Sequence, residues 1–215
     1  MTQTVGVVPL EGRGSLPFVD LHREVLFLHA IRALLDVDRL AGRVVATVEP
    51  GQLAAAVSAL DRSDLPAMVE DADTWWRTLT GPLTLMLHDP LCPLVPAAFL
   101  SRCLDEAVSS ADRDALVAFR PVTDTIKTVV DDRIVDTLDR DRFGIVASPL
   151  VFDHCPGADE PVPPTADFGA LAGWLRGRGT VQLHRAPSLG RRVDDLSAVN
   201  LLECMDELAR VVEET

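Results

Sequence analysis

Apolar residues along this chain gather in short continuous runs that alternate with segments of helical periodicity. Runs typical of strands occupy residues 4–8, 43–48, 67–69, 83–89, 115–119, 145–152 (with an expected interruption at Pro149) and 180–184. Apolar spacing of three and four residues predicts helices over 25–35, 52–60, 96–108, 165–176 and 194–213. This alternation indicates an α/β fold with a mostly parallel sheet and flanking helices.

The uninterrupted run from Leu83 to Asp89 predicts a strand buried on both faces, central in the sheet and stopped by Pro90. Open α/β sheets bind ligands at the carboxyl ends of their strands, which is where Asp89 falls. The alternative is that Asp89 only caps the following turn. A second candidate site is the Gly-containing loop 9–17, which separates a strand from a helix as in nucleotide-binding folds.

Polar and apolar residues alternate from Thr123 to Val130 and again from Ile134 to Leu138, around a polar turn. This pattern predicts a β-hairpin inserted between α/β elements. A two-stranded hairpin is marginal alone, so it must pack against a second subunit or fold back onto its own sheet. The sequence thus predicts one domain over residues 1–215, with 121–140 as an arm that joins a homodimer.

Composition narrows the possible partners. The formal net charge of −13 argues against a nucleic-acid surface, and no apolar run reaches membrane-spanning length. The four cysteines have no CxxC spacing, which favours reduced thiols in a cytoplasmic protein over a disulfide frame or zinc site. Adjacent Trp75 and Trp76 predict a packed lid over a sheet edge, with a ligand platform as the alternative.

Several segments recur together in one known family, and they span nearly the whole chain. They are Val7-Val-Pro9 before the Gly loop, Leu87-His-Asp89, Pro121-Val-Thr-Asp-Thr-Ile-Lys127, Leu138-Asp-Arg140, Ser148-Pro149 and Asp194-Asp-Leu196. In these the chain resembles 2-C-methyl-D-erythritol 4-phosphate cytidylyltransferase. The resemblance implies a Rossmann-like nucleotidyltransferase fold, a β-arm that interlocks two subunits, and transfer of a cytidylyl group from CTP with Mg2+.

The resemblance also implies roles for single residues. Gly12 and Gly14 match the nucleotide loop, and Asp89 matches an aspartate near CTP and its metal. Substrate-binding positions of the family fall on three further residues, two of them on the arm: Thr125, Arg140 and Asp167. We therefore expect a residual pocket bordered by Gly12, Gly14 and Asp89.

Other positions depart from the family pattern. The loop places Glu11 beside a polyanion site, the lysine that follows the loop in the family has no counterpart here, and Cys92 replaces a motif arginine. The late family lysine falls near Gly190, beside Arg191 and Arg192.

Two functions follow from these departures. The first is a homologue with weak or lost CTP turnover, which acts by binding a nucleotide, a sugar phosphate or a protein partner. The alternative is an active enzyme for CTP or another nucleotide, in which catalytic Arg13 and Arg191, or Arg192, replace the missing cations and Mg2+ is the cofactor.

Overall fold

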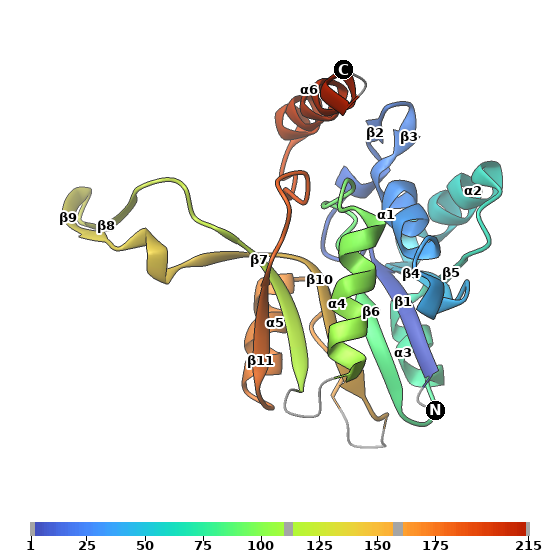
Figure 1. Cartoon of the computed structure of the whole chain (residues 1–215). Helices are drawn as coiled ribbons and strands as arrows, with labels where there is room; N and C mark the ends of the chain where they lie inside the picture. The colour runs from blue at the N-terminus through green and yellow to red at the C-terminus, as the bar shows by residue number, and fades with distance from the viewer. Residues whose placement is uncertain (1–2, 110–113, 157–160, 214–215) are drawn as a thin grey trace.

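The computed structural model describes residues 3–109, 114–156 and 161–213, in which helices cover both faces of a seven-stranded sheet (Figure 1). The strand order is β11-β7-β10-β6-β1-β4-β5. The strands are β1 (Gln3–Pro9), β4 (Val44–Val48), β5 (Met68–Asp71), β6 (Leu83–Leu87), β7 (Ala115–Pro121), β10 (Gly144–His154) and β11 (Val181–Arg185). Only β10 runs antiparallel to its neighbours, so the prediction of a mostly parallel sheet is confirmed.

Two helix layers bury the two faces of this sheet. One layer holds α1 (Leu26–Leu35), α2 (Leu53–Ser63) and α4 (Ala97–Ser109), and the other holds α3 (Ala72–Thr78) and α5 (Phe168–Arg176), while α6 (Leu196–Glu213) packs outside these layers. Successive residues of a strand point to opposite faces, so Val8 packs with α1, α2 and α4 while Val7 packs with α3 and α5. None of the helices in the described ranges has the length and hydropathy that a membrane crossing requires.

A third, smaller apolar cluster ties α6 to the segment after the Gly loop. That segment forms a short hairpin of β2 (Asp20–Leu21) and β3 (Glu24–Val25), which the sequence did not predict. Leu21 and Leu26 pack there against Val199 and Leu202 of α6. The first part of α6 therefore packs against the region that follows the Gly loop (Figure 1).

The expected interruption at Pro149 is found in the pairing of β10 with β7, whereas the strand itself is continuous. The strand continues from Gly144 to His154, and its pairing with β7 shifts register between Val146 and Leu150. A bulge accommodates residues that cannot donate to the ladder, so a proline can sit inside a strand at this point.

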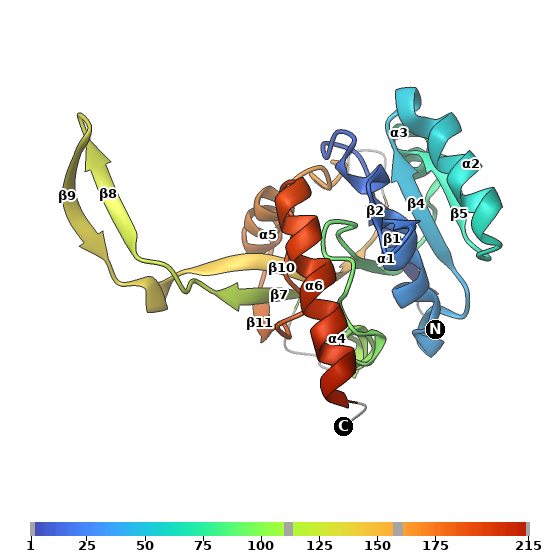
Figure 2. The same cartoon turned by 90° about the horizontal axis from the view of Figure 1, so that it is seen from above.

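The predicted hairpin is formed by β8 (Ile126–Val130) and β9 (Arg133–Leu138), with Asp131 and Asp132 in the left-handed region at the turn. Its two strands pair only with each other, as a separate sheet. Figure 2 shows that this arm extends well away from the seven-stranded sheet. The alternative in which the hairpin folds back onto its own sheet is therefore wrong.

Candidate functional site

The Gly loop and Asp89 meet because β1 and β6 are parallel neighbours, so their carboxyl ends lie side by side. Gly12 and Gly14 both have positive φ, at 74° and 57°. A Cβ atom on Gly12 would lie 2.7 Å from the Cβ of Ala166, so this position admits only glycine for steric as well as backbone reasons. The loop is thereby held against the segment that precedes α5.

Arg13 turns inward from this loop and pairs with Asp89. Its Nε donates to Asp89 Oδ1 at 2.8 Å, and both side chains are 2% exposed. Nη1 and Nη2 donate to the carbonyl oxygens of Glu11 and Thr165, at 2.7 and 3.2 Å. The guanidinium also lies 5.2 Å from the ring centre of Phe168. Each nitrogen of Arg13 is thus engaged by the protein itself.

The second oxygen of Asp89 is engaged as well. Oδ2 accepts from Arg192 Nε at 3.1 Å, and Oδ1 accepts from the Leu91 N–H at 3.1 Å. Burial alone raises the pKa of Asp89, but the charges of Arg13 and Arg192 and the Leu91 hydrogen bond hold the pKa below its ordinary value. Asp89 therefore stays ionised, caps its turn as one hypothesis proposed, and bridges two arginines.

Two glutamates occupy the side of the loop where a polyanion is expected. The buried carboxylate of Glu11 accepts from the hydroxyls of Thr47 and Thr165. Glu49 Oε1 accepts from the Gly12 N–H at 3.0 Å, a backbone donor of the kind that binds phosphate in Gly loops. The carboxylate of Glu49 is thus the anion that this loop holds.

His88 lies fully buried beside this ion pair. The Asp89 N–H donates to Ser148 Oγ at 3.0 Å, so the Ser148 hydroxyl proton is free to donate to Nδ1 of His88. Nε2 then carries the ring proton, and it has no partner among the described residues. Burial lowers the pKa of His88 to about 4 against the opposing charge of Asp89, so the imidazole is neutral at pH 7.

An open cavity of about 430 Å³ lies next to Arg192, where β7 and β10 lead into the arm. We call it the arginine cavity because Arg120, Arg191 and Arg192 line it. Asp124 and Asp194 are its acidic lining residues, and Arg192 also pairs with Asp194. The described lining thus carries one more positive than negative charge, in a chain whose net charge is −13.

The remaining predicted site residues lie in different places. Arg191 is exposed and lines the arginine cavity, whereas Thr125 and Arg140 are exposed on the arm and line none of the five cavities described. Asp167 caps α5, accepting from the N–H groups of Gly169 and Ala170. Gly12, Gly14 and Asp89 also line none of these five cavities, and the Arg13 side chain lies where a pocket between them was expected.

The residues around Asp89 do not fit a magnesium ion. A carboxylate that binds Mg2+ must present a free oxygen lone pair to it, usually with several waters. Both Asp89 oxygens instead face arginines, and the side chain is 2% exposed. Among the described residues there is also no group of three or more His, Cys, Asp or Glu side chains suited to a metal.

The cysteines are unpaired, as the sequence predicted. Cys92, at the position of the motif arginine, is fully buried. Burial and the charge of Asp89 raise the pKa of its thiol, against the effects of Arg192, Arg13 and Arg120. A neutral apolar group has therefore taken the place of a cation beside Asp89.

Two residues of this region were not singled out from the sequence. Glu49 directly follows the strand that ends at Val48, and Arg120 follows the apolar run 115–119. Because the carboxyl ends of parallel strands converge on one edge of a sheet, a charged residue at such an end was the available signal.

Comparison with known proteins gives a consistent set of relatives. The 2-C-methyl-D-erythritol 4-phosphate cytidylyltransferase of Bordetella parapertussis is 30% identical over 180 residues, which cover 69% of this chain and 72% of that protein. A bifunctional enzyme IspD/IspF of Solidesulfovibrio magneticus is 38% identical over 69 residues, or 32% of this chain and 17% of that protein. This chain thus spans a small part of the bifunctional protein. No family model matches the chain.

Solved structures agree on the fold. The 4-diphosphocytidyl-2C-methyl-D-erythritol synthase from Anaerococcus prevotii superposes with a TM-score of 0.71 over 96% of both chains, at 11% identity. At this identity the similarity establishes the architecture alone, and the chemistry of the site has to be inferred from the residues of this chain.

Asp89→Asn leaves the buried Arg13 guanidinium without its closest counter-charge. We expect the free energy of unfolding to fall by about 3–5 kcal/mol, measured by urea denaturation at neutral pH. Asp194→Asn is the matched control: Asp194 also pairs with Arg192 but is 70% exposed. Its loss should cost less than about 1 kcal/mol. Equal effects of the two substitutions would contradict the buried pair.

His88 should make the fold sensitive to mild acid. The unfolded chain protonates histidine near pH 6.5 and the folded chain only near pH 4, so stability falls as pH drops through this window. The shift corresponds to roughly 3 kcal/mol. We expect His88→Asn to lose this part of the pH dependence in urea denaturation between pH 7.5 and pH 4. Parallel curves for the two proteins would show that His88 does not resist protonation.

Proposed function

Because this chain belongs to the 2-C-methyl-D-erythritol 4-phosphate cytidylyltransferase family, we propose that it holds a small phosphorylated ligand while its turnover of CTP is weak or lost. The observation that carries this proposal is the buried Arg13–Asp89 pair, which places the protein's own side chains at the nucleotide end of the sheet. The fold of the family is kept, and the proposed change lies in the charges of the loop.

The loop lacks what a nucleotidyl transfer needs. Enzymes of this chemistry work by positioning phosphates and neutralising the charge that develops on them. Each guanidinium nitrogen of Arg13, the cation of the loop, already donates to Asp89 or to a carbonyl group. Glu11 and Glu49 add negative charge where pyrophosphate would leave. Without a fitting metal ligand at Asp89, nothing in this arrangement favours CTP.

The arginine cavity supports binding of a phosphorylated compound. Guanidinium groups match phosphate geometry, and Arg191 has no ion-pair partner among the described residues. A volume of about 430 Å³ suits a small polyol phosphate. We propose 2-C-methyl-D-erythritol 4-phosphate, the compound named in the relatives, as the first ligand to test. We propose that Thr125 and Arg140 contribute to such a site from the arm of a second copy.

The arm supports a homodimer. Val129, Val130, Ile134 and Val135 on it are 52–66% exposed, an apolar surface that soluble monomers avoid. A groove of about 870 Å³ opens at the root of the arm, with Phe143 and Leu183 in its lining, themselves 44% and 61% exposed. We infer that the arm of a second copy covers these residues, because a twofold pairing buries both exposed surfaces at once.

For activity, we expect CTP-dependent pyrophosphate release in the presence of 2-C-methyl-D-erythritol 4-phosphate and Mg2+ to be far below the ordinary enzyme range of about 1–1,000 per second. A rate within that range overturns the proposed loss of turnover. Arg13→Ala and Arg191→Ala, each checked for folding by circular dichroism, would then identify the cation responsible, since loss of the rate in a folded variant shows that the removed charge serves catalysis.

Ligand binding is measured separately by calorimetry. We expect 2-C-methyl-D-erythritol 4-phosphate to bind, and Arg191→Gln to weaken binding by about tenfold, the effect of losing one charged hydrogen bond. The exposed Arg62 on α2 provides the control, since Arg62→Gln leaves the arginine cavity intact. Absence of binding, or equal effects of the two substitutions, would refute this ligand site.

For assembly, we expect a dimer at micromolar concentration by light scattering. Ile134→Asp should shift it toward the monomer, because burying an unpaired carboxylate at the interface costs several kcal/mol, about 2–7 for a polar group. Val57→Asp, on the exposed face of α2, should leave the mass unchanged. A wild-type monomer, or a dimer untouched by Ile134→Asp, would disprove this interface.

A further inference from the structure

A second cavity, of about 460 Å³, lies at the opposite edge of the sheet from Asp89. The amino ends of β1, β4 and β6 border it with Gln3, Val44 and Leu83, and α3 contributes Trp75. At a rise of about 3.3 Å per residue, β6 separates Leu83 from Asp89 by about 20 Å. This cavity, which we call the Trp75 cavity, is therefore separate from the nucleotide end and the arginine cavity.

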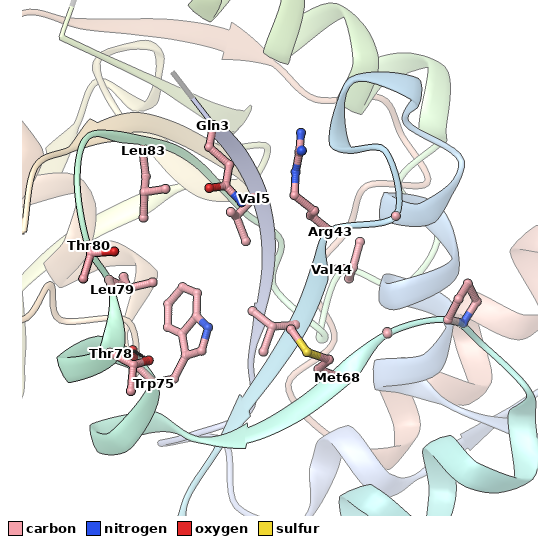
Figure 3. Close-up of a pocket in the computed structure, with 14 residues that line it drawn as sticks. Gln3, Val5, Arg43, Val44, Met68, Trp75, Thr78, Leu79, Thr80 and Leu83 are labelled. Carbon is pink, nitrogen blue, oxygen red and sulfur yellow. Dashed lines mark hydrogen bonds between the residues drawn. The ribbon is translucent and has the colours of Figure 1, made fainter. Parts of the chain in front are cut away.

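The walls of the Trp75 cavity are apolar and include a flat aromatic group. Figure 3 shows Trp75 and Leu79 on the α3 side, with Val44 and Met68 across from them. Trp75 is 7% exposed and packs edge to face against Trp76, with 4.8 Å between the ring centres, so its indole is fixed in place. Aromatic rings prefer such an edge or face as a partner, and this wall favours a planar apolar ligand.

One charged residue lines the cavity among those described. Arg43 donates its Nε–H to the carbonyl of Thr4 at 2.9 Å, which anchors the guanidinium at the rim. Its two terminal nitrogens have no partner among the described residues, and no acidic side chain stands in the described lining. Gln3 and Thr80 add neutral polar groups to the rim. In a chain of net charge −13, this site favours an anionic group over a cationic one.

We propose that the Trp75 cavity binds a small aromatic carboxylate, with its ring beside Trp75 and its carboxylate on the terminal nitrogens of Arg43. Cavities of this size, mostly apolar with a few polar groups that fix orientation, are typical small-molecule sites. The planar guanidinium fork suits a carboxylate, which accepts two parallel hydrogen bonds. The Trp75 cavity shares no lining residue with the arginine cavity and lies away from the nucleotide end, so this proposal can be tested independently of the proposed function.

The test uses 2-naphthoate as the probe and its neutral amide, 2-naphthamide, as the matched compound. Binding to the full-length isotope-labelled protein is followed by NMR, with the Trp75 indole N–H signal identified through Trp75→Phe. We expect saturable shifts at Trp75 and Met68 with the carboxylate, and affinity for the amide about tenfold lower because it lacks the charge that Arg43 binds.

Two arginine variants complete the experiment. Arg43→Gln should weaken 2-naphthoate binding by about tenfold, whereas Arg77→Gln should leave it unchanged. Arg77 is a fair control because it lies on α3, its side chain is 77% exposed, and it does not line the cavity. The proposal is wrong if 2-naphthoate does not bind at millimolar concentration or if the shifts appear at Arg191 instead. It is also wrong if 2-naphthamide binds as tightly as 2-naphthoate, or if Arg43→Gln binds 2-naphthoate as tightly as the unchanged protein.

Discussion

The buried carboxylate of Asp89 is the group on which this end of the molecule depends. A charge with 2% exposure is tolerated only when its oxygens are paired, and here Arg13 and Arg192 pair with one oxygen each. Through these contacts three distant segments meet: the Gly loop, the end of β6 and the segment before α6. The same contacts engage both oxygens of Asp89 and all three nitrogens of Arg13, so a metal or a phosphate would have to compete with them.

The surrounding charges extend this arrangement. The carboxylate of Glu49 accepts a hydrogen bond from the Gly12 N–H. Thr165, just before the start of α5, donates its hydroxyl to Glu11 and accepts from Arg13 at its carbonyl oxygen. A polyanion entering here would have to displace the exposed Glu49–Gly12 hydrogen bond and the buried bonds of Glu11 and Arg13. The arginine cavity has no such obstacle, because Arg191 is exposed and faces open space. The family fold therefore presents two adjacent regions, one closed by its own side chains and one open to an anion.

Much of the fold could be predicted from the sequence because the signals are local. The run 83–87 is apolar except for Thr84, so its burial in the centre of the sheet was expected, and the position of Asp89 followed from Pro90. The arm was predicted from its alternation. The β2–β3 hairpin was not, because each of its strands has two residues and its turn places His22 and Arg23, both non-glycine, at positive φ.

The chemistry of the site was harder to predict for a physical reason. Whether Arg13 faces solvent or Asp89 depends on contacts with residues 76 and 152 positions away. No local pattern encodes such pairings, so the sequence left open whether Arg13 replaces a missing nucleotide-binding cation. The acidic residues at strand ends, Glu49 among them, carried a usable signal, but their partners became evident only in three dimensions.

A crystal structure of the protein grown with CTP and Mg2+ tests the closed nucleotide end most directly. We expect Arg13 Nε to remain within hydrogen-bond distance of Asp89 Oδ1, Glu49 to keep the Gly12 N–H, and no triphosphate to lie along the Gly loop. A triphosphate bound along residues 12–14, with Arg13 turned away from Asp89 and a metal ion on its carboxylate, would contradict this.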